Sequence, residues 1–326
     1  MIYIFKNIID YYKNFIDSRM FILVPELSMK DDFYYKMITK CGEGYLKIYL
    51  LNNFMVINAN YIPKKNFEKI SEIQEDYVEI SQFESDSSIL KEENKDSINV
   101  GFGIFSYINN SKKVSVYCKK YEPVKFTKII LTEDYYDKFL KDKFEKDFEN
   151  VKSIMRFVSL NPFLPEINFL FQQIKSCKAK GLSKKIYIES KILELLSLST
   201  QIYEEKNNIN KLSVKITPED KKYLENVLNY MKNNLNAYPS IEDMAEISNM
   251  SKNRFQMAFK KIYGATYYKY FQMLKFNRAL LLLNNSNYSI KKISSMVGYS
   301  NTGHFTGLFR KMYGVTPKKY RDIFNL

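Results

Sequence analysis

The chain offers few residues that could carry out chemistry. His304 is its only histidine, so imidazole catalysis and a metal site with several histidines are excluded outside that neighbourhood. Cys41, Cys118 and Cys177 lie far apart and form no CxxC pair, which predicts plain thiols rather than a disulfide framework or a zinc site. We expect no catalytic residue, no metal and no cofactor.

Short glycine and acidic motifs do not change this expectation. Segments 42–44 and 101–103 are GxG fragments without the third glycine and the following helix of a dinucleotide-binding fingerprint, so we interpret them as turns or bulges. The acidic pairs at 31–32 and 92–93 stand in polar surroundings, whereas acid–base catalysis by two carboxylates needs burial. The sequence indicates a binding protein rather than an enzyme.

The net charge of +14 favours an anionic partner such as nucleic acid or an acidic membrane surface. Residues 215–326 contain 18 basic and 7 acidic residues, net +11, whereas residues 1–214 contain 32 and 29, net +3. Four of the six arginines lie within the last 73 residues. The basic surplus therefore belongs to the C-terminal part.

No segment predicts membrane insertion or secretion. The longest apolar runs, Met20–Val24 and Ala279–Leu283, have five residues each, against the ~20 that span a bilayer. The first 15 residues mix charged and apolar side chains and lack a small-residue cleavage site, which does not fit a secretory signal. We expect a cytoplasmic protein that does not enter a membrane.

The pattern of elements predicts an α+β chain with more than one domain. A length of 326 residues favours two domains. Residues 1–131 contain short β-branched and aromatic runs separated by turn residues, which predicts a small antiparallel β domain, as a sheet or a barrel. The expected strands are at 45–51, 54–62, 77–83, 100–108, 113–121 and 125–131.

Residues 132–210 form the next expected part, because their apolar side chains recur at helical spacing. Within this part, a broad apolar face suits a dimer contact as well as a core. The face includes Ile188, Ile192, Leu195 and Leu196. Residues 211–217 are polar and read as a linker to a C-terminal domain at 218–326.

The C-terminal domain contains an internal repeat. Residues 241–270 match residues 290–320 at an offset of 49, which becomes 50 after one extra residue. The identities include Ile241/Ile290, Phe255/Phe305, Phe259/Phe309, Lys261/Lys311, Tyr263/Tyr313, Gly264/Gly314, Thr266/Thr316 and Tyr270/Tyr320. Such self-similarity predicts two copies of one structural unit.

The first copy parses into two short helices joined by a tight turn. Ser240 and Asp243 predict a capping box at the start of a helix over 241–247. Ser251 then caps a second helix, and Gly264 supplies its left-handed stop. The second copy repeats this with Ser289, a turn at 298–299, a helix over 302–313 and Gly314.

Two helices joined in this way are typical of the helix-turn-helix, whose second helix enters the major groove of DNA. An ordinary helical hairpin is the alternative for one copy alone. Duplication together with the net charge of +11 favours DNA binding. We therefore predict helix-turn-helix units at 241–263 and 290–313, joined by an all-helical connection.

That connection, residues 267–284, is an unbroken helical pattern. Eighteen residues at 1.5 Å each give about 27 Å, somewhat less than the ~34 Å of one DNA turn. A rigid connector of this length can hold two recognition helices in successive major grooves on one face of the duplex. We expect the two units to act as an intramolecular pair.

Over roughly residues 218–324 the chain resembles the AraC/XylS-type bacterial transcription regulators. The motifs that carry the resemblance are SIEDMAEISNMSKNRFQMAFKKIYG, MLKFNRALLLL, SIKKISSMVGYS and HFTGLFRKMYGVTPKKYR. The resemblance implies an N-terminal domain, often a cupin-like barrel, that binds an effector or mediates dimerisation, and a C-terminal domain that binds promoter DNA. The segment QIKSCKAKGLSKKIYIESKILELLSL is similar to the pyochelin-regulator branch, which implies a ferric siderophore as a candidate effector.

The resemblance also implies which residues read bases. The family's positions correspond to Asn253, Gln256 and Met257 in the first unit and to Thr302, Gly303, Thr306 and Gly307 in the second. Asparagine and glutamine can pair with adenine, and threonine or methionine can touch a thymine methyl group. The two glycines offer no side chain, so we expect the second unit to read shape more than sequence.

Basic residues around these positions are candidate phosphate contacts, although any one of them could be merely solvated. They are Lys252, Arg254, Lys260, Lys261, Arg310, Lys311, Lys318 and Lys319. His304 precedes a core phenylalanine, so we expect a packing or backbone-contact role, with a DNA contact as the alternative.

The leading hypothesis is a sequence-specific transcription regulator, an activator, that is controlled by a small-molecule effector. Its expected partners are double-stranded promoter DNA, RNA polymerase, the effector and a second copy of the chain. An architectural DNA-binding protein and a DNA-modifying enzyme with the same reading domain are the alternatives.

Overall fold

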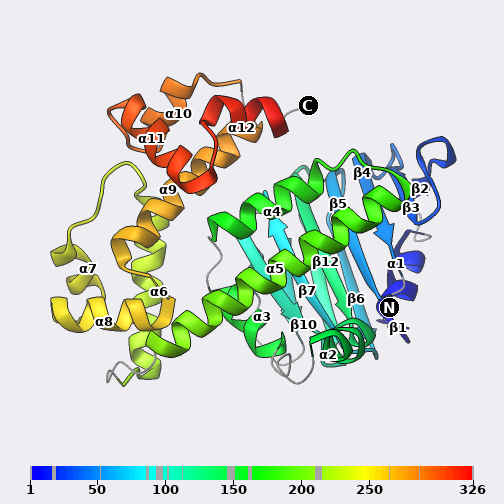
Figure 1. The fold of residues 1–326 in the computed structure, drawn as a ribbon, viewed down its shortest axis with the longest axis horizontal. Coiled ribbons are helices and arrows are strands. Elements are labelled where there is room, and N and C mark those ends of the chain that lie inside the picture. The colour runs from blue at the N-terminus through cyan, green and yellow to red at the C-terminus, as the bar shows by residue number, and fades with distance from the viewer. Residues whose placement is uncertain are drawn as a thin grey trace. The chain divides into compact units, whose positions relative to one another are not determined.

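The computed structural model describes residues 2–16, 20–51, 53–85, 88–92, 98–100, 103–111, 113–144, 151–160, 164–209, 215–263, 265–285 and 287–324 (Figure 1). The chain forms two compact units, residues 1–162 and residues 163–326. The predicted helical part, 132–210, is therefore divided between the two units. Each unit is described by itself below.

The first unit contains two sheets. A five-stranded sheet has the order β1 (Ile2–Phe5), β6 (Phe67–Ile73), β11 (Lys113–Cys118), β8 (Ser88–Glu92) and β9 (Ile98–Val100). A seven-stranded sheet has the order β10 (Gly103–Ile108), β7 (Tyr77–Phe83), β12 (Val124–Thr132), β5 (Phe54–Pro63), β4 (Gly42–Leu50), β3 (Asp32–Met37) and β2 (Phe21–Leu23). The β1–β6 pair is parallel and the other described pairs are antiparallel, which confirms the predicted antiparallel β domain.

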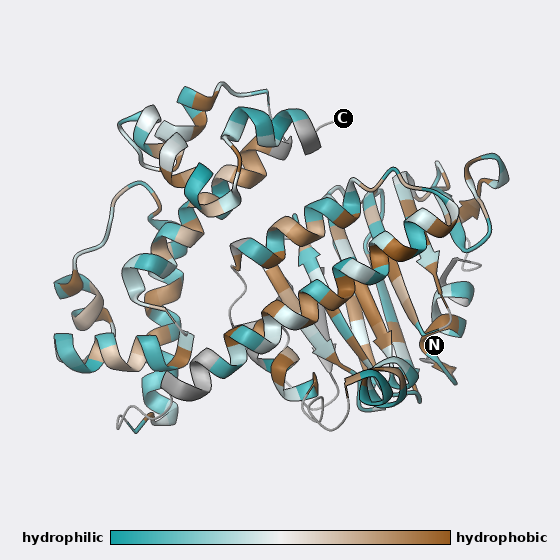
Figure 2. Cartoon of the chain, viewed as in Figure 1, coloured by the Kyte–Doolittle hydropathy of each residue, from teal (hydrophilic) through white to brown (hydrophobic). Residues whose placement is uncertain are grey.

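Hydrophobic side chains from both sheets form the core of this unit. Ile130 of β12 lies opposite Met55 of β5, and both are buried in one cluster with Ile73 of β6 and Cys118 of β11. Strand β7 is buried along its whole length although it contains polar residues. Figure 2 shows apolar colour concentrated on the strands, whereas the helices alternate polar and apolar along their length.

The described residues of the first unit include the short helical segments α1 (Ile8–Ile16), a 3₁₀ turn (Pro25–Leu27), a π-helical turn (Asp134–Phe139), α2 (Leu140–Phe144) and α3 (Val151–Leu160). Helix α3 packs on β10, where the Ser106 hydroxyl donates a hydrogen bond to the Met155 carbonyl. The helical period predicted to begin near residue 133 is thereby confirmed.

The second unit is helical. It consists of α4 (Pro165–Lys175), α5 (Gly181–Ile209), α6 (Pro218–Asn233), α7 (Ile241–Ile247), α8 (Lys252–Tyr263), α9 (Tyr267–Asn285), α10 (Ile290–Met296), α11 (Thr302–Tyr313) and α12 (Pro317–Phe324). Thr217 and Asp220 form a capping box that begins α6. Of the predicted linker, residues 215–217 precede α6, and residues 211–214 lie outside the described residues.

Among the described residues, no helix has the length and apolar character needed to cross a bilayer.

Candidate nucleic-acid interface

The two repeats fold into equivalent helix-turn-helix units. Helices α7 and α8 are joined through Asn249, with φ of 50°, and α10 and α11 are joined through Gly298, with φ of 75°. These two residues are 49 apart, the offset of the repeat. Both take the left-handed conformation, which asparagine and glycine tolerate best. The repeat therefore preserves the turn geometry that orients each second helix.

Capping fixes where these helices begin. Ser240 and Asp243 form the predicted capping box of α7, and the Ser289 hydroxyl accepts the Lys292 backbone N–H at the start of α10. Gly314 ends α11 with φ of 74°, as the sequence predicts. Its counterpart Gly264 lies outside the described residues.

Helix α8 presents its predicted base-reading side chains outward. Phe255 and Phe259 are fully buried and hold the inner face of the helix in the core. Asn253, Gln256 and Met257 are exposed on the opposite face. The amide groups of the first two are therefore accessible to a duplex.

Helix α11 has the same buried face but a barer outer one. Phe305, Phe309 and Tyr313 are buried, whereas Thr302 and Thr306 are partly exposed. A side chain at Gly307 would meet no atom within 4 Å, and one at Gly303 would meet only the Asn301 side-chain oxygen. Few groups on this face can reach a base edge.

His304 is exposed in the first turn of α11. Asn301 accepts a hydrogen bond from its backbone N–H at 2.8 Å, and its ring approaches the edge of Tyr299 with a centroid distance of 5.9 Å. The ring therefore packs against one aromatic neighbour, and its accessible part leaves the alternative of a DNA contact open.

Two of the predicted phosphate contacts already have carboxylate partners. Lys252 pairs with Glu242 of α7 at the surface, and the Arg254 guanidinium lies 2.8 Å from Asp220 of α6. Burial raises the pKa of Asp220, but the Thr217 backbone N–H and the Arg254 guanidinium outweigh this and leave the pKa lowered. Arg254 therefore connects α8 to α6, whereas the exposed ion pair of Lys252 and Glu242 contributes little to the stability of the fold.

The other predicted phosphate contacts remain accessible at the surface. Among the described residues, no ion pair involves the five exposed cations Lys260, Arg310, Lys311, Lys318 and Lys319. Lys261 is partly exposed and interacts with another residue of the chain. The exposed cations lie in the last turns of α8 and α11 and at the start of α12, where they can meet a polyanion.

Two further cations were missed from the sequence. Lys291 and Lys292 are exposed in the first turn of α10, at the repeat positions that Glu242 and Asp243 occupy in α7. The first helix of a helix-turn-helix crosses the DNA backbone, so this exchange of acid for base favours phosphate contacts by the second unit. Aligning the repeats by charge as well as by identity would have found it.

The predicted dimerisation face lies on α5 and is buried within the chain. Ile188, Ile192, Leu195 and Leu196 have at most 2% of their surface exposed. Their role in a dimer stays a prediction. On the same helix Ile186 is 60% exposed and is accessible to a second copy without rearrangement.

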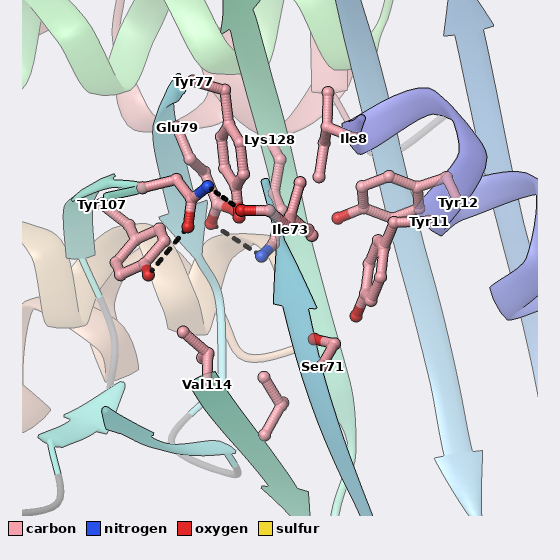
Figure 3. A pocket seen from close by; sticks show the side chains of 12 residues that line it. Ile8, Tyr11, Tyr12, Ser71, Ile73, Tyr77, Glu79, Tyr107, Val114 and Lys128 are labelled. Carbon is pink, nitrogen blue, oxygen red and sulfur yellow. Dashed lines mark hydrogen bonds and ion pairs between the residues drawn. The ribbon is translucent and has the colours of Figure 1, made fainter. Parts of the chain in front are cut away.

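The first unit contains a cavity of about 50 Å³ between its two sheets and α1 (Figure 3). Tyrosines dominate its wall, with an ion pair among them. The lining comprises Ile8, Tyr11, Tyr12, Ser71, Ile73, Tyr77, Glu79, Tyr107, Asn109, Val114, Val116 and Lys128. Such a space holds about three or four water molecules.

An ion pair gives the cavity its polar side. Lys128 of β12 lies 2.7 Å from Glu79 of β7, and their side chains are 16% and 8% exposed. Ser81 donates a second hydrogen bond to Glu79 at 2.6 Å. Burial, and next the Glu79 carboxylate, raise the pKa of Tyr12 and Tyr77 well above the ordinary value, so both phenols keep their protons.

The described residues contain no group of three or more histidine, cysteine, aspartate or glutamate side chains that could hold a metal ion.

Comparison with known proteins matches both parts of the chain. The profile of a helix-turn-helix domain matches residues 244–323, and that of the N-terminal domain of regulatory protein PchR matches residues 70–211. The first match contains α8 and α11. The second contains β7, β11 and β12, three of the strands that line the cavity.

Three relatives agree with these matches. The MmsAB operon regulatory protein of Pseudomonas aeruginosa is 36% identical over 28% of this chain and 30% of its own. Transcriptional activator PerA of Escherichia coli O127:H6 is 26% identical over 60% and 68%. The bifunctional transcriptional activator/DNA repair enzyme AdaA of Bacillus subtilis is 30% identical over 32% and 49%.

The match therefore spans less than a third of the first relative and about half of the third. The repeated helix-turn-helix, its two outward-facing second helices and these sequence matches agree with one another. Over its C-terminal part the chain is similar to the AraC/XylS family of DNA-binding transcription regulators, and over residues 70–211 to the N-terminal domain of regulatory protein PchR.

Proposed function

We propose that the chain is a sequence-specific activator that reads promoter DNA with both helix-turn-helix units and responds to a small molecule bound in the first unit. The exposed row of Asn253, Gln256 and Met257 on α8 carries this proposal. Amide side chains on a recognition helix can discriminate bases by about 1–3 kcal/mol for a good bidentate pair.

The division of polar and basic groups supports different work by the two units. The first helix-turn-helix unit exposes amides on its recognition helix. The second helix-turn-helix unit exposes glycines on its recognition helix and the lysines Lys291 and Lys292 on α10. Base contacts specify sequence and phosphate contacts position the protein. The first helix-turn-helix unit therefore supplies most of the sequence specificity, and the second supplies most of the contacts to the DNA backbone.

The effector site that we propose is the tyrosine-lined cavity. Its protonated phenols can donate hydrogen bonds, and the Glu79–Lys128 pair can exchange its partners for polar groups of a ligand. About 50 Å³ is far below the ~300–1,000 Å³ of sites for drug-sized ligands. A compact effector of a few heavy atoms fits best, and a ferric siderophore would require the sheets to separate.

The remaining partners follow from the family. We propose that the protein acts in the cytoplasm, forms a homodimer through α5, contacts RNA polymerase when bound at a promoter and performs no catalysis. PerA is named as an activator, which supports activation here. AdaA is named as both an activator and a repair enzyme, and it is the reason to test repair activity directly.

Selection of bound duplexes from a randomised pool tests the proposed specificity with the full chain. We expect one defined sequence to be enriched and bound at least ~10³-fold more tightly than unrelated DNA at physiological salt. Recovery of unrelated duplexes with equal affinity would support an architectural DNA-binding protein instead. Assays of glycosylase and alkyl transfer on damaged duplexes should give no product.

A variant that fills the cavity tests the effector site. Native mass spectrometry of the purified chain should show a small molecule, and Val116→Phe should abolish its retention because it places a ring in the cavity. The variant should keep the selected DNA sequence and lose only the response to the ligand. Unchanged retention by Val116→Phe would move the effector site elsewhere.

A further inference from the structure

Lys275 is a fully buried lysine in the middle of α9, the helix that joins the two helix-turn-helix units. Its ammonium nitrogen lies 4.0 Å from the ring centroid of Tyr238, 5.2 Å from that of Tyr299 and 5.3 Å from that of Phe271. It also donates a hydrogen bond of 3.4 Å to the Gly298 carbonyl. Within the described part of the chain, no carboxylate forms an ion pair with it.

The two nearest tyrosines lie far apart in the sequence, one just before the first helix-turn-helix unit and one inside the second. Tyr238 lies in the segment that leads into α7, where its ring stacks on Tyr268 with a centroid distance of 4.7 Å. Tyr299 lies in the turn between α10 and α11. Its ring centroid lies 5.5 Å from that of Phe305, in the core of the second helix-turn-helix unit. The two tyrosine hydroxyls are 3.3 Å apart. One ammonium group therefore lies between the segment that leads into α7 and the turn of the second helix-turn-helix unit.

The backbone of the segment that leads into α7 also approaches the turn of the second helix-turn-helix unit at this point. A Cβ atom on Gly298 would lie 2.4 Å from the Asn236 carbonyl oxygen and 2.8 Å from the Lys275 nitrogen. Gly298 has φ of 75°, a conformation that other residues rarely adopt. Glycine is therefore required here both by its own backbone and by the neighbouring segment.

We propose that Lys275 is a positioning residue that sets the separation of the two recognition helices, by holding Tyr238, which leads into the first helix-turn-helix unit, and Tyr299 of the second around one ammonium group. A cation is attracted to the faces of aromatic rings, and this attraction is strongest where water is excluded. Without the charge, the two rings keep only their hydroxyl contact, and the two units gain freedom about α9. This inference rests on the proposed reading of one duplex by both units.

A fixed separation has a consequence that DNA binding can measure. Two rigidly held recognition helices fit their half-sites at one spacing, because each inserted base pair both shifts and rotates the second site along the duplex. The wild-type chain should therefore discriminate strongly against a changed spacing. A chain in which the units move independently should discriminate weakly.

The test uses the full chain and the duplex selected from the randomised pool, with the two protected segments mapped by footprinting. Affinity is measured for this duplex and for one with two base pairs inserted between the segments. Lys275→Met removes the charge and keeps an unbranched side chain, and it should fold because it removes a buried charge. Arg278→Met is the matched control, because Arg278 is an exposed cation on the same helix.

We expect the wild-type chain and Arg278→Met to lose about tenfold or more in affinity on insertion, and Lys275→Met to lose less than about threefold. Equal losses in folded Lys275→Met and wild type would overturn the role of Lys275. If Lys275→Met does not fold, Tyr238→Leu replaces it, because it removes the ring nearest the ammonium group and leaves Lys275 in place. This variant should lose less affinity on insertion than Arg278→Met does, and an equal loss would also overturn the inference.

The wild-type result separates this inference from the proposed function. A wild-type chain that binds both duplexes equally would contradict the reading of one duplex by both units, and Lys275 would then have no separation to set. A wild-type chain that discriminates, beside a Lys275→Met variant that discriminates as strongly, would contradict only the inference about Lys275.

Discussion

The side-chain amide of Asn168 in α4 donates a hydrogen bond of 3.2 Å to the amide oxygen of Asn277 in α9, and both side chains are buried. Phe169, the next residue along α4, packs against the core of the second helix-turn-helix unit. Helix α4 also contacts α11. A helix that lies outside the DNA-binding domain in sequence is therefore anchored to the unit that contains α11.

Asn168→Ala tests the strength of this anchor. The substitution leaves the buried Asn277 oxygen without this donor, so we expect the free energy of unfolding to fall by about 1–3 kcal/mol. Urea denaturation of the full chain measures the change. Asn277→Ala and the double variant complete a cycle, and a coupling energy near zero would show that the two amides do not support each other.

The C-terminal part could be predicted in detail because its signals are local. Ser240 with Asp243, Ser289 and Gly314 mark helix ends through contacts within a few residues, and the structure places each as expected. The internal repeat then predicted that the two helix-turn-helix units have the same fold. The predicted helix over 267–284 differs from α9 by a single residue.

Contacts between distant segments could not be predicted in the same way. Strand β6 has the sequence FEKISEI, in which Glu68 and Lys69 follow each other, so it lacks the strict alternation of polar and apolar residues that indicates a strand. The ion pair of Glu79 and Lys128 joins residues 49 apart on neighbouring strands. Lys275 reads as an ordinary polar position of a helix, and only the fold shows that aromatic rings from both units surround it.

Gln256→Ala and Thr306→Ala should affect base preference unequally. Gln256 is exposed on α8 and can form two hydrogen bonds to one base, whereas Thr306 is partly exposed beside a glycine and offers one hydroxyl. Repeating the duplex selection with each variant should show relaxed preference at identifiable base pairs for Gln256→Ala and a smaller change for Thr306→Ala.

Arg310→Ala is the control for this comparison. It should weaken binding evenly across sequences and reduce the salt dependence by about one counterion, because a phosphate contact carries no sequence information. A larger change in base preference for Thr306→Ala than for Gln256→Ala would reverse the roles assigned to the two units.

Lys69 should make the stability of the fold depend on pH. Its ammonium nitrogen lies 4.2 Å from the Tyr11 ring centroid, and burial lowers its pKa to about 7. In the unfolded chain a lysine has a pKa of about 10.4. Between these values the unfolded state binds more protons, so stability rises with pH from about 7 to 10.

Lys69→Met removes this contribution. The difference in free energy of unfolding between the variant and the wild type should favour the variant near pH 7 and shrink as pH rises, by at most about 1.4 kcal/mol per pH unit. Denaturant titrations at several pH values measure it, with the exposed Lys65→Met as control. A difference that does not change with pH would show that Lys69 titrates normally.

Gly307 is a glycine that the fold of the chain does not require. It lies within α11, and a Cβ atom there would meet no atom within 4 Å, so Gly307→Ala should raise the free energy of unfolding by roughly 1 kcal/mol. If α11 lies against the duplex with this face, the same methyl group meets DNA, and affinity for the selected duplex should fall. Gly303→Ala is the contrasting variant, because its Cβ would lie 3.1 Å from the Asn301 oxygen that caps the helix, and it should stabilise less. A more stable Gly307→Ala that binds DNA as tightly as the wild type would show that this face of α11 stays clear of the duplex.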